Sequence, residues 1–103
     1  MPLSVEFIRD SVGSGAYGLS VHADDERLAD GLTVREVEEA LVSAELLEDY
    51  PDDPRGHSCL VLGYTGGQPV HVVCGLSRQG RAIVITVYRP RLPKWKDERT
   101  RNR

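Results

Sequence analysis

The first part of the chain carries its apolar residues at helical spacing. Apolar side chains three or four positions apart predict a helix over residues 3–12 that ends at Gly13. A second short helix is expected to begin at Ser20, whose hydroxyl can accept from free backbone N–H groups, and to stop at Gly31.

The third predicted helix has the clearest start signal. Thr33 and Glu36 stand three positions apart, the spacing of a capping box in which each side chain accepts from the other residue's backbone N–H. Helical periodicity follows at Val34, Val37, Leu41 and Ala44. We therefore predict a helix over residues 33–43.

From residue 45 onward the pattern changes to alternation with a period of two. Tyr17–Leu19 is interpreted only as a short extended link, and residues 51–56 as a loop rich in proline and aspartate. Short turns separate the last apolar runs, and Pro90 ends the final one. The predicted strands are residues 46–50, 58–64, 69–76 and 81–88.

Helices followed by hairpin-connected strands predict an α+β fold. Consecutive strands joined by short turns must run antiparallel, so we expect N-terminal helices packed on one face of a three- to four-stranded antiparallel sheet. Residues 1–96 are expected to form a single domain. The basic tail, residues 97–103, is expected to be disordered because it has no apolar anchor.

Composition is that of an ordinary globular domain of 103 residues, 40% hydrophobic and 28% charged. No apolar run approaches the roughly 18 residues of a membrane span. The first residues lack the basic start and apolar stretch of a signal peptide, so we expect a cytoplasmic protein without membrane contact. Cys59 and Cys74 lie in strand-like runs without metal-ligand spacing and are interpreted as buried thiols.

Charge is distributed unevenly along the chain. Residues 78–103 hold nine of the 13 basic residues and two acids, whereas residues 1–77 hold four bases and 14 acids. This asymmetry favours either an edge that faces a polyanion or a basic arm covered by an acidic partner.

Several short motifs, taken in their order along the chain, resemble one family of small bacterial proteins. They begin with Ser20-x-His22-Ala23 and Gly31-Leu32-Thr33, and end with Ile85-Thr86-Val87-Tyr88-Arg89-Pro90. Between them lie the segments 48–56, 60–63 and 69–73, and Trp95 follows. In this order they resemble the family called domain of unknown function 4258, over about residues 5–96.

The resemblance implies a relation to RelE/ParE-type toxins, which are small α+β proteins with an antiparallel sheet. It implies a toxin-like component of a bacterial toxin–antitoxin pair. The implied partner is an antitoxin, in some cases one with a zinc finger. RelE-like toxins cut messenger RNA without a metal or other cofactor, whereas ParE-like ones inhibit gyrase, so the fold alone does not fix the activity. Members often carry basic residues where this chain has Glu26 and Asp30, which weakens the case for RNA cleavage.

Metal-free RNA cleavage needs a base for the 2′-hydroxyl, cations for the phosphate and an acid for the leaving oxygen. We predict His22 and His71 as proton-transfer groups and Arg89 as a phosphate-binding cation, these three forming the candidate catalytic set. The alternative is that both histidines are structural and that Arg89 pairs with an internal acid such as Glu48 or Asp49.

Four further residues are candidates for RNA or phosphate binding. Arg55 offers a cation in the loop, and Tyr50 can stack on a base or donate a hydrogen bond. Arg91 and Lys94 begin the basic C-terminal segment. No metal site is predicted, because the adjacent acids in the loop lack a third ligand.

Strand alternation places Arg89 on one face with Ile83, Ile85 and Val87, and Tyr88 on the other. Two functions remain open from the sequence. The first is a toxin with metal-independent mRNA endoribonuclease activity. The second is a non-catalytic module that binds a protein partner and in which the histidines are structural.

Overall fold

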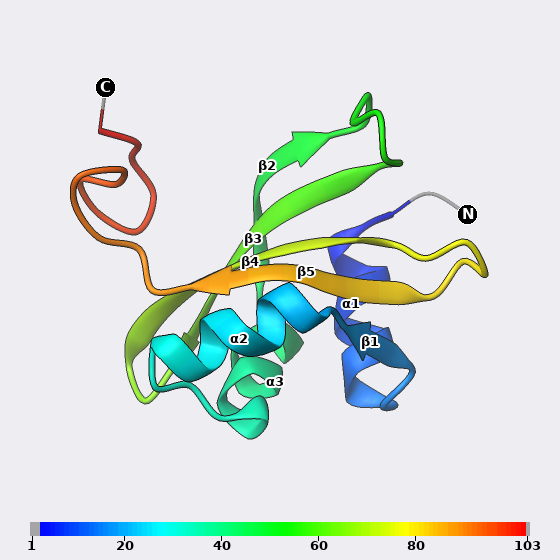
Figure 1. Cartoon of the computed structure of the whole chain (residues 1–103), viewed down its shortest axis with the longest axis horizontal. Helices are drawn as coiled ribbons and strands as arrows, with labels where there is room; N and C mark the ends of the chain where they lie inside the picture. The colour runs from blue at the N-terminus through cyan, green and yellow to red at the C-terminus, as the bar shows by residue number, and fades with distance from the viewer. Residues whose placement is uncertain (1–2, 103) are drawn as a thin grey trace.

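The computed structural model describes residues 3–102 and shows an α+β fold, as predicted. These residues form three helices: α1 (Val5–Gly13), α2 (Val21–Ala29) and α3 (Val34–Val42). One sheet contains five strands: β1 (Tyr17–Leu19), β2 (Glu45–Tyr50), β3 (Ser58–Thr65), β4 (Gln68–Leu76) and β5 (Ala82–Tyr88). Figure 1 shows β1 between α1 and α2, the other strands after α3, and the C-terminal segment last.

Side-chain caps explain where the helices begin. Ser20 starts α2 by accepting from the backbone N–H of Ala23 at 3.0 Å. At α3, Thr33 accepts from the N–H of Glu36 at 3.0 Å, and the Glu36 carboxylate accepts from the N–H of Thr33 at 2.9 Å. The predicted capping box is therefore confirmed.

The sheet differs from the prediction of three or four antiparallel strands. Its order is β1-β5-β4-β3-β2, and β1 pairs with β5 in parallel, so the sheet is mixed and five-stranded. The segment expected to be a link, Tyr17–Leu19, is this extra strand, which pairs with residues 82–84. The other four strands form the predicted antiparallel meander.

A β-bulge in β5 changes which side chains share a face. Val73 pairs with Thr86 while its neighbour Cys74 pairs with Val84, so Ile85 is an extra residue on β5. Val84 and Val87 consequently both point into the core, with exposed fractions of 2% and 0%. The predicted strict alternation put Arg89 on the same face as Ile83, Ile85 and Val87. Because of the bulge, Arg89 shares a face with Val87 but not with Ile83 and Ile85.

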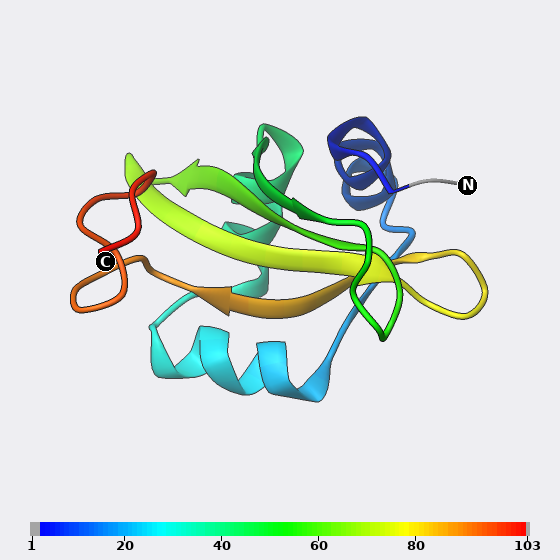
Figure 2. The same cartoon turned by 90° about the horizontal axis from the view of Figure 1, so that it is seen from above.

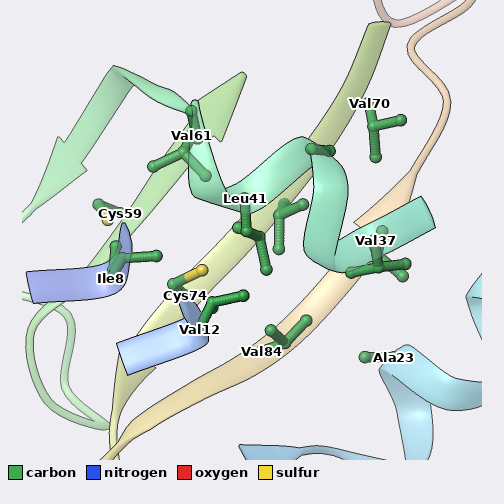
Figure 3. Packing of buried hydrophobic residues seen from close by; sticks show 14 of the residues in the cluster. Ile8, Val12, Ala23, Val37, Leu41, Cys59, Val61, Val70, Cys74 and Val84 are labelled. Carbon is green, nitrogen blue, oxygen red and sulfur yellow. The ribbon is translucent and has the colours of Figure 1, made fainter. Parts of the chain in front are cut away.

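The main core lies between the sheet and the helices. Helix α3 packs on β3 and β4, α1 packs on α3, and α2 runs alongside β5 (Figures 1 and 2). Figure 3 shows side chains of α1 and α3 meeting those of the strands, with Ala23 of α2 close to Val84. The approach of α3 to β3 is close because Gly63 has no side chain: a Cβ there would lie 1.9 Å from the carbonyl oxygen of Ala40.

The C-terminal segment, residues 91–102, covers part of the opposite sheet face. Trp95 is 2% exposed and pairs with Arg101 in an isolated bridge, and the N–H of Asn102 donates to the carbonyl of Lys94 at 2.8 Å. Residues 97–102, which belong to the tail expected to be disordered, form bends and a bridge beside Trp95, and disorder of the tail stays a prediction. Arg103 lies outside the described residues.

Candidate functional site

A cavity of about 350 Å³ opens where β5 ends against α2 and the C-terminal segment begins. Its walls combine acidic, basic and aromatic side chains from three different parts of the chain. They include Glu26, Tyr88, Arg89, Arg91, Lys94 and Trp95. Because three of the predicted phosphate-binding cations line it, we call this cavity the α2–β5 pocket.

Helix α2 closes the edge of β5 beyond the point where β1 stops. The carboxylate of Glu26 accepts from the N–H of Val87 at 3.1 Å, and that of Asp30 accepts from the N–H of Arg89 at 2.8 Å. The hydroxyl of Ser20 donates to the carbonyl of Ile85 at 2.9 Å. Side chains on α2 and at its two caps thus replace the missing neighbour strand and fix the end of β5 at the pocket.

Both arginines that follow β5 contact Asp30. The Nε of Arg89 donates to the backbone carbonyl of Asp30 at 3.2 Å, and Nη2 of Arg91 lies 3.2 Å from the Asp30 carboxylate. The Asp30 carboxylate thus accepts from the backbone N–H of Arg89, and the Arg89 guanidinium contacts the Asp30 carbonyl. Neither contact involves Glu48 or Asp49, the acids named in the alternative. The side chain of Arg91 is 62% exposed, so its remaining N–H groups face solvent.

His22 lies one helical turn before Glu26 on α2. Its Nε2 is 3.2 Å from Oε1 of Glu26, and its side chain is 67% exposed. Since Glu26 lines the α2–β5 pocket, this contact places an imidazole beside the rim, where it is open to solvent. The sequence predicted His22 as a site residue, and in the structure His22 contacts Glu26, which lines the pocket.

His71 is fully buried behind Tyr88 and Trp95. Its Nε2 lies 2.7 Å from the carbonyl oxygen of Glu98, which can only accept, so Nε2 carries the proton. Its Nδ1 therefore accepts from the Tyr88 hydroxyl at 3.1 Å, and that hydroxyl accepts from Nε1 of Trp95 at 3.2 Å. Burial lowers the pKa of His71, which favours the same neutral form.

This network gives His71 a supporting position. The ring centroid lies 4.4 Å from that of Trp95 and 5.2 Å from that of Tyr88, both in edge-on arrangements. With no exposed surface, His71 cannot touch a ligand in the α2–β5 pocket; it holds the tyrosine and tryptophan that form part of the wall.

The two remaining candidates do not join the α2–β5 pocket. Arg55 is 85% exposed in the loop between β2 and β3 and contacts Asp53 with its Nε at 3.3 Å. Tyr50 lies on β2, where its hydroxyl donates to Glu48 and lies 3.5 Å from Nη2 of Arg101. Burial is the main reason that the pKa of Tyr50 is raised.

Most charge of the basic tail is matched by acids of β2. Arg99 lies 2.6 Å from Glu45, and Arg101 contacts both carboxylate oxygens of Glu48 at 2.7 and 2.8 Å. The Arg101 guanidinium also lies 4.6 Å from the centroid of the Trp95 ring. The hydrogen bond from Arg101 lowers the pKa of Glu48 to about 2. These contacts pair two cations of the tail with acids of β2, whereas Lys94 lines the α2–β5 pocket.

Residues 3–102 contain no group of three histidine, cysteine, aspartate or glutamate side chains placed to hold a metal ion. Cys59 and Cys74 face each other across β3 and β4 as free, buried thiols. Burial raises the pKa of Cys59 to about 11 and raises that of Cys74 further, so both are protonated at neutral pH. Within the same residues, no helix has the length and apolar character needed to cross a membrane.

Three residues at or beside the pocket were not predicted from the sequence: Glu26, Asp30 and Trp95. Both acids counted as departures from a basic pattern, although their four-residue spacing puts them on one face of α2, where they reach alternate residues of β5. Trp95 follows the last strand and was considered only as part of the family resemblance; its large aromatic side chain among polar neighbours is the signal that could have marked it as buried.

The chain matches the family described as Domain of unknown function (DUF4258) over residues 19–89. This range covers more than half of the chain, so the protein belongs to that family. No curated protein and no solved structure matches the chain. The match includes α2 and β5, and the C-terminal wall of the α2–β5 pocket, with Arg91, Lys94 and Trp95, follows it.

Proposed function

We propose that this member of the family is the toxin-like component of a bacterial toxin–antitoxin pair and cleaves messenger RNA at the α2–β5 pocket. The observation that carries this proposal is the convergence of Arg89, Arg91 and Lys94 on one cavity, beside the imidazole of His22. The resemblance of the motifs to RelE/ParE-type toxins supports it, and a partner antitoxin is part of the proposal.

Each step of the proposed cleavage has a group in or beside the pocket. The imidazole of His22 accepts the proton of an RNA 2′-hydroxyl, whose oxygen attacks the adjacent phosphorus. Arg89 and Arg91 stabilise the additional negative charge on the phosphoryl oxygens. The bond from phosphorus to the 5′-oxygen breaks, and the ammonium of Lys94 gives that oxygen a proton, leaving a 2′,3′-cyclic phosphate. These steps need only side chains of this chain.

A second candidate function is a non-catalytic module that binds a protein. The observation that favours it is the outward face of α2, where Val21 and Leu28 are 80% and 60% exposed and stand two helical turns apart. In this reading His71 is structural, and Glu26 and Asp30 serve only to fasten α2 to β5. The surface of α2 would then contact the partner.

Inducible expression in a bacterial host tests the two functions, with growth and total messenger RNA followed together. Arg89→Ala removes the guanidinium but leaves the backbone N–H that binds Asp30, so the fold should persist. Arg78→Ala is the matched control, because Arg78 is exposed in the turn before β5, at the opposite end of that strand from the pocket.

Growth arrest with RNA loss in the wild type and Arg78→Ala, but not in Arg89→Ala, is the result we expect. Purified wild-type protein should also cut single-stranded RNA in the presence of a chelator. Normal growth and intact RNA with the wild type would contradict the ribonuclease function and favour the binding module. Retained toxicity in Arg89→Ala would remove Arg89 from the site.

A further inference from the structure

Asp30 contacts both arginines of the α2–β5 pocket from a fixed position. It caps the C-terminal end of α2, and its side chain is only 13% exposed. One carboxylate oxygen accepts from the N–H of Arg89 at 2.8 Å, and the other lies 3.2 Å from Nη2 of Arg91. The backbone carbonyl of the same residue accepts from Nε of Arg89 at 3.2 Å.

These contacts hold the two guanidinium groups without using up their donors. A guanidinium has five N–H donors in a planar fork, and the contacts to Asp30 engage Nε of Arg89 and one amino group of Arg91. The other donors remain to receive the oxygens of a phosphate, which a guanidinium can bind in a bidentate manner. The position of the Asp30 carboxylate is itself held by the backbone N–H of Arg89, which donates to its second oxygen.

We propose that Asp30 is a positioning residue that aligns Arg89 and Arg91 as a paired clamp for one phosphate group of RNA. This inference rests on the proposed function, since the clamp matters only if RNA binds at the α2–β5 pocket. It also assigns a role to an acid that the sequence alone marked as unfavourable for an RNA-binding surface. An arginine without an anchored acceptor samples many rotamers and loses that freedom on binding, whereas an anchored one is already oriented.

The test is the affinity for a single-stranded RNA oligonucleotide of mixed sequence, measured by fluorescence anisotropy at low salt. Asp30→Asn keeps an oxygen that can accept from the Arg89 N–H but removes the charge that holds Arg91. Asp25→Asn is the matched control, because it removes the same charge from an exposed position of α2. Relative to this control, we expect Asp30→Asn to weaken RNA binding about tenfold, as befits a lost charge-assisted hydrogen bond.

A second pair of variants separates positioning from general damage to the fold. In an Arg91→Ala background, the effect of Asp30→Asn should shrink markedly, because Asp30 then has no Arg91 side chain to orient. If Asp30→Asn merely loosened the end of β5, its effect would stay the same in that background. Unfolding midpoints of all variants show whether they are folded at the temperature of the binding measurement.

Each outcome decides between the two proposals. Wild-type protein that binds no RNA at low salt would contradict the proposed function, and this inference would fall with it. RNA binding by the wild type, with equal affinities for Asp30→Asn and Asp25→Asn, would contradict the positioning role alone. Tighter binding by Asp30→Asn than by Asp25→Asn would mean that Asp30 competes with phosphate, which also overturns the inference.

Discussion

At the scale of single residues, His71 links the fold to pH. Its two ring nitrogens are already bonded to Tyr88 and to the carbonyl of Glu98. A second ring proton would point at a tyrosine hydroxyl that now donates to that nitrogen and accepts from Trp95. The hydroxyl would have to turn away, and a charge would be buried, so protonation opposes the folded state.

Because His71 is buried and neutral, the protein should lose stability in mild acid. The pKa of His71 is lowered from 6.5 in the folded protein, so below about pH 6.5 the unfolded chain binds more protons than the folded one. The contribution of neutral His71 to the free energy of unfolding is complete above that pH. It declines as the pH falls, by at most about 1.4 kcal/mol per pH unit. Urea unfolding of the wild type between pH 7.5 and 5.0 measures it.

The comparison variants are His71→Gln and His22→Gln. The first removes the buried titrating group, and the pH dependence over this interval should become shallower than in the wild type. The second makes the same substitution at an exposed histidine on α2 and serves as the comparison for the histidine-to-glutamine change itself. An unchanged slope in His71→Gln would show that other groups cause the acid sensitivity.

At the scale of elements, the packing of α3 on β3 depends on Gly63. A Cβ at this position would lie 1.9 Å from the carbonyl oxygen of Ala40 and 2.9 Å from its Cα, and backbone atoms cannot rotate away. Gly63→Ala should therefore push α3 off the sheet and lower the free energy of unfolding by about 3 kcal/mol.

Gly13→Ala is the control for this substitution. Gly13 ends α1, and a Cβ there meets no atom within 4 Å, so the change should leave stability unchanged or raise it slightly. Denaturant unfolding of both variants gives the comparison. A cost below about 1 kcal/mol for Gly63→Ala would mean that α3 can shift without losing its contacts.

The elements that sequence reasoning predicted are those with local signals. The capping box at Thr33 and the turns between strands involve residues close in sequence, and the antiparallel strands agree with their predicted ranges to within a residue. β1 was not predicted as a strand, because three residues are too few to show a periodicity and its partner strand lies more than sixty positions away. The bulge at Ile85 was not predicted for a related reason, since only the pairing of β5 with β4 shows that β5 has an extra residue.

At the scale of the whole molecule, other parts of the chain pack against both faces of the sheet. The helices cover one face, and the segment 91–102 covers part of the other through Trp95. The charge asymmetry of the sequence follows from this arrangement in part, because Arg99 and Arg101 of the tail pair with Glu45 and Glu48 of β2. One basic arm thus has its acidic partner within the same chain.

Trp95 should consequently control the order of the whole C-terminal segment. Trp95→Ala removes a side chain that is 2% exposed and contacts His71, Tyr88 and Arg101, so unfolding should cost about 3–5 kcal/mol less. Limited proteolysis should cleave peptide bonds within residues 91–102 faster in Trp95→Ala than in the wild type. Lys96→Ala, at an exposed neighbouring position, is the control and should behave as the wild type.

The same long-range contacts explain which site residues the sequence could predict. Arg89, Arg91 and Lys94 are close in sequence at the end of one strand, so a local charge cluster pointed to them, and they line one pocket. His71 was a candidate by residue type, but its burial depends on Trp95, which covers it from 24 positions further along the chain. Asp30 acquires its role only through the pairing of α2 with β5.

The closure of the β5 edge by Glu26 and Asp30 also bears on self-association. An open strand edge offers free N–H groups to which a second chain can add, and this is a common route to aggregation. Here two carboxylates occupy the N–H groups of Val87 and Arg89, which β1 is too short to reach. Replacing Glu26 or Asp30 by a residue that cannot accept a hydrogen bond should therefore make the protein more prone to aggregate. This effect does not depend on any function of the α2–β5 pocket.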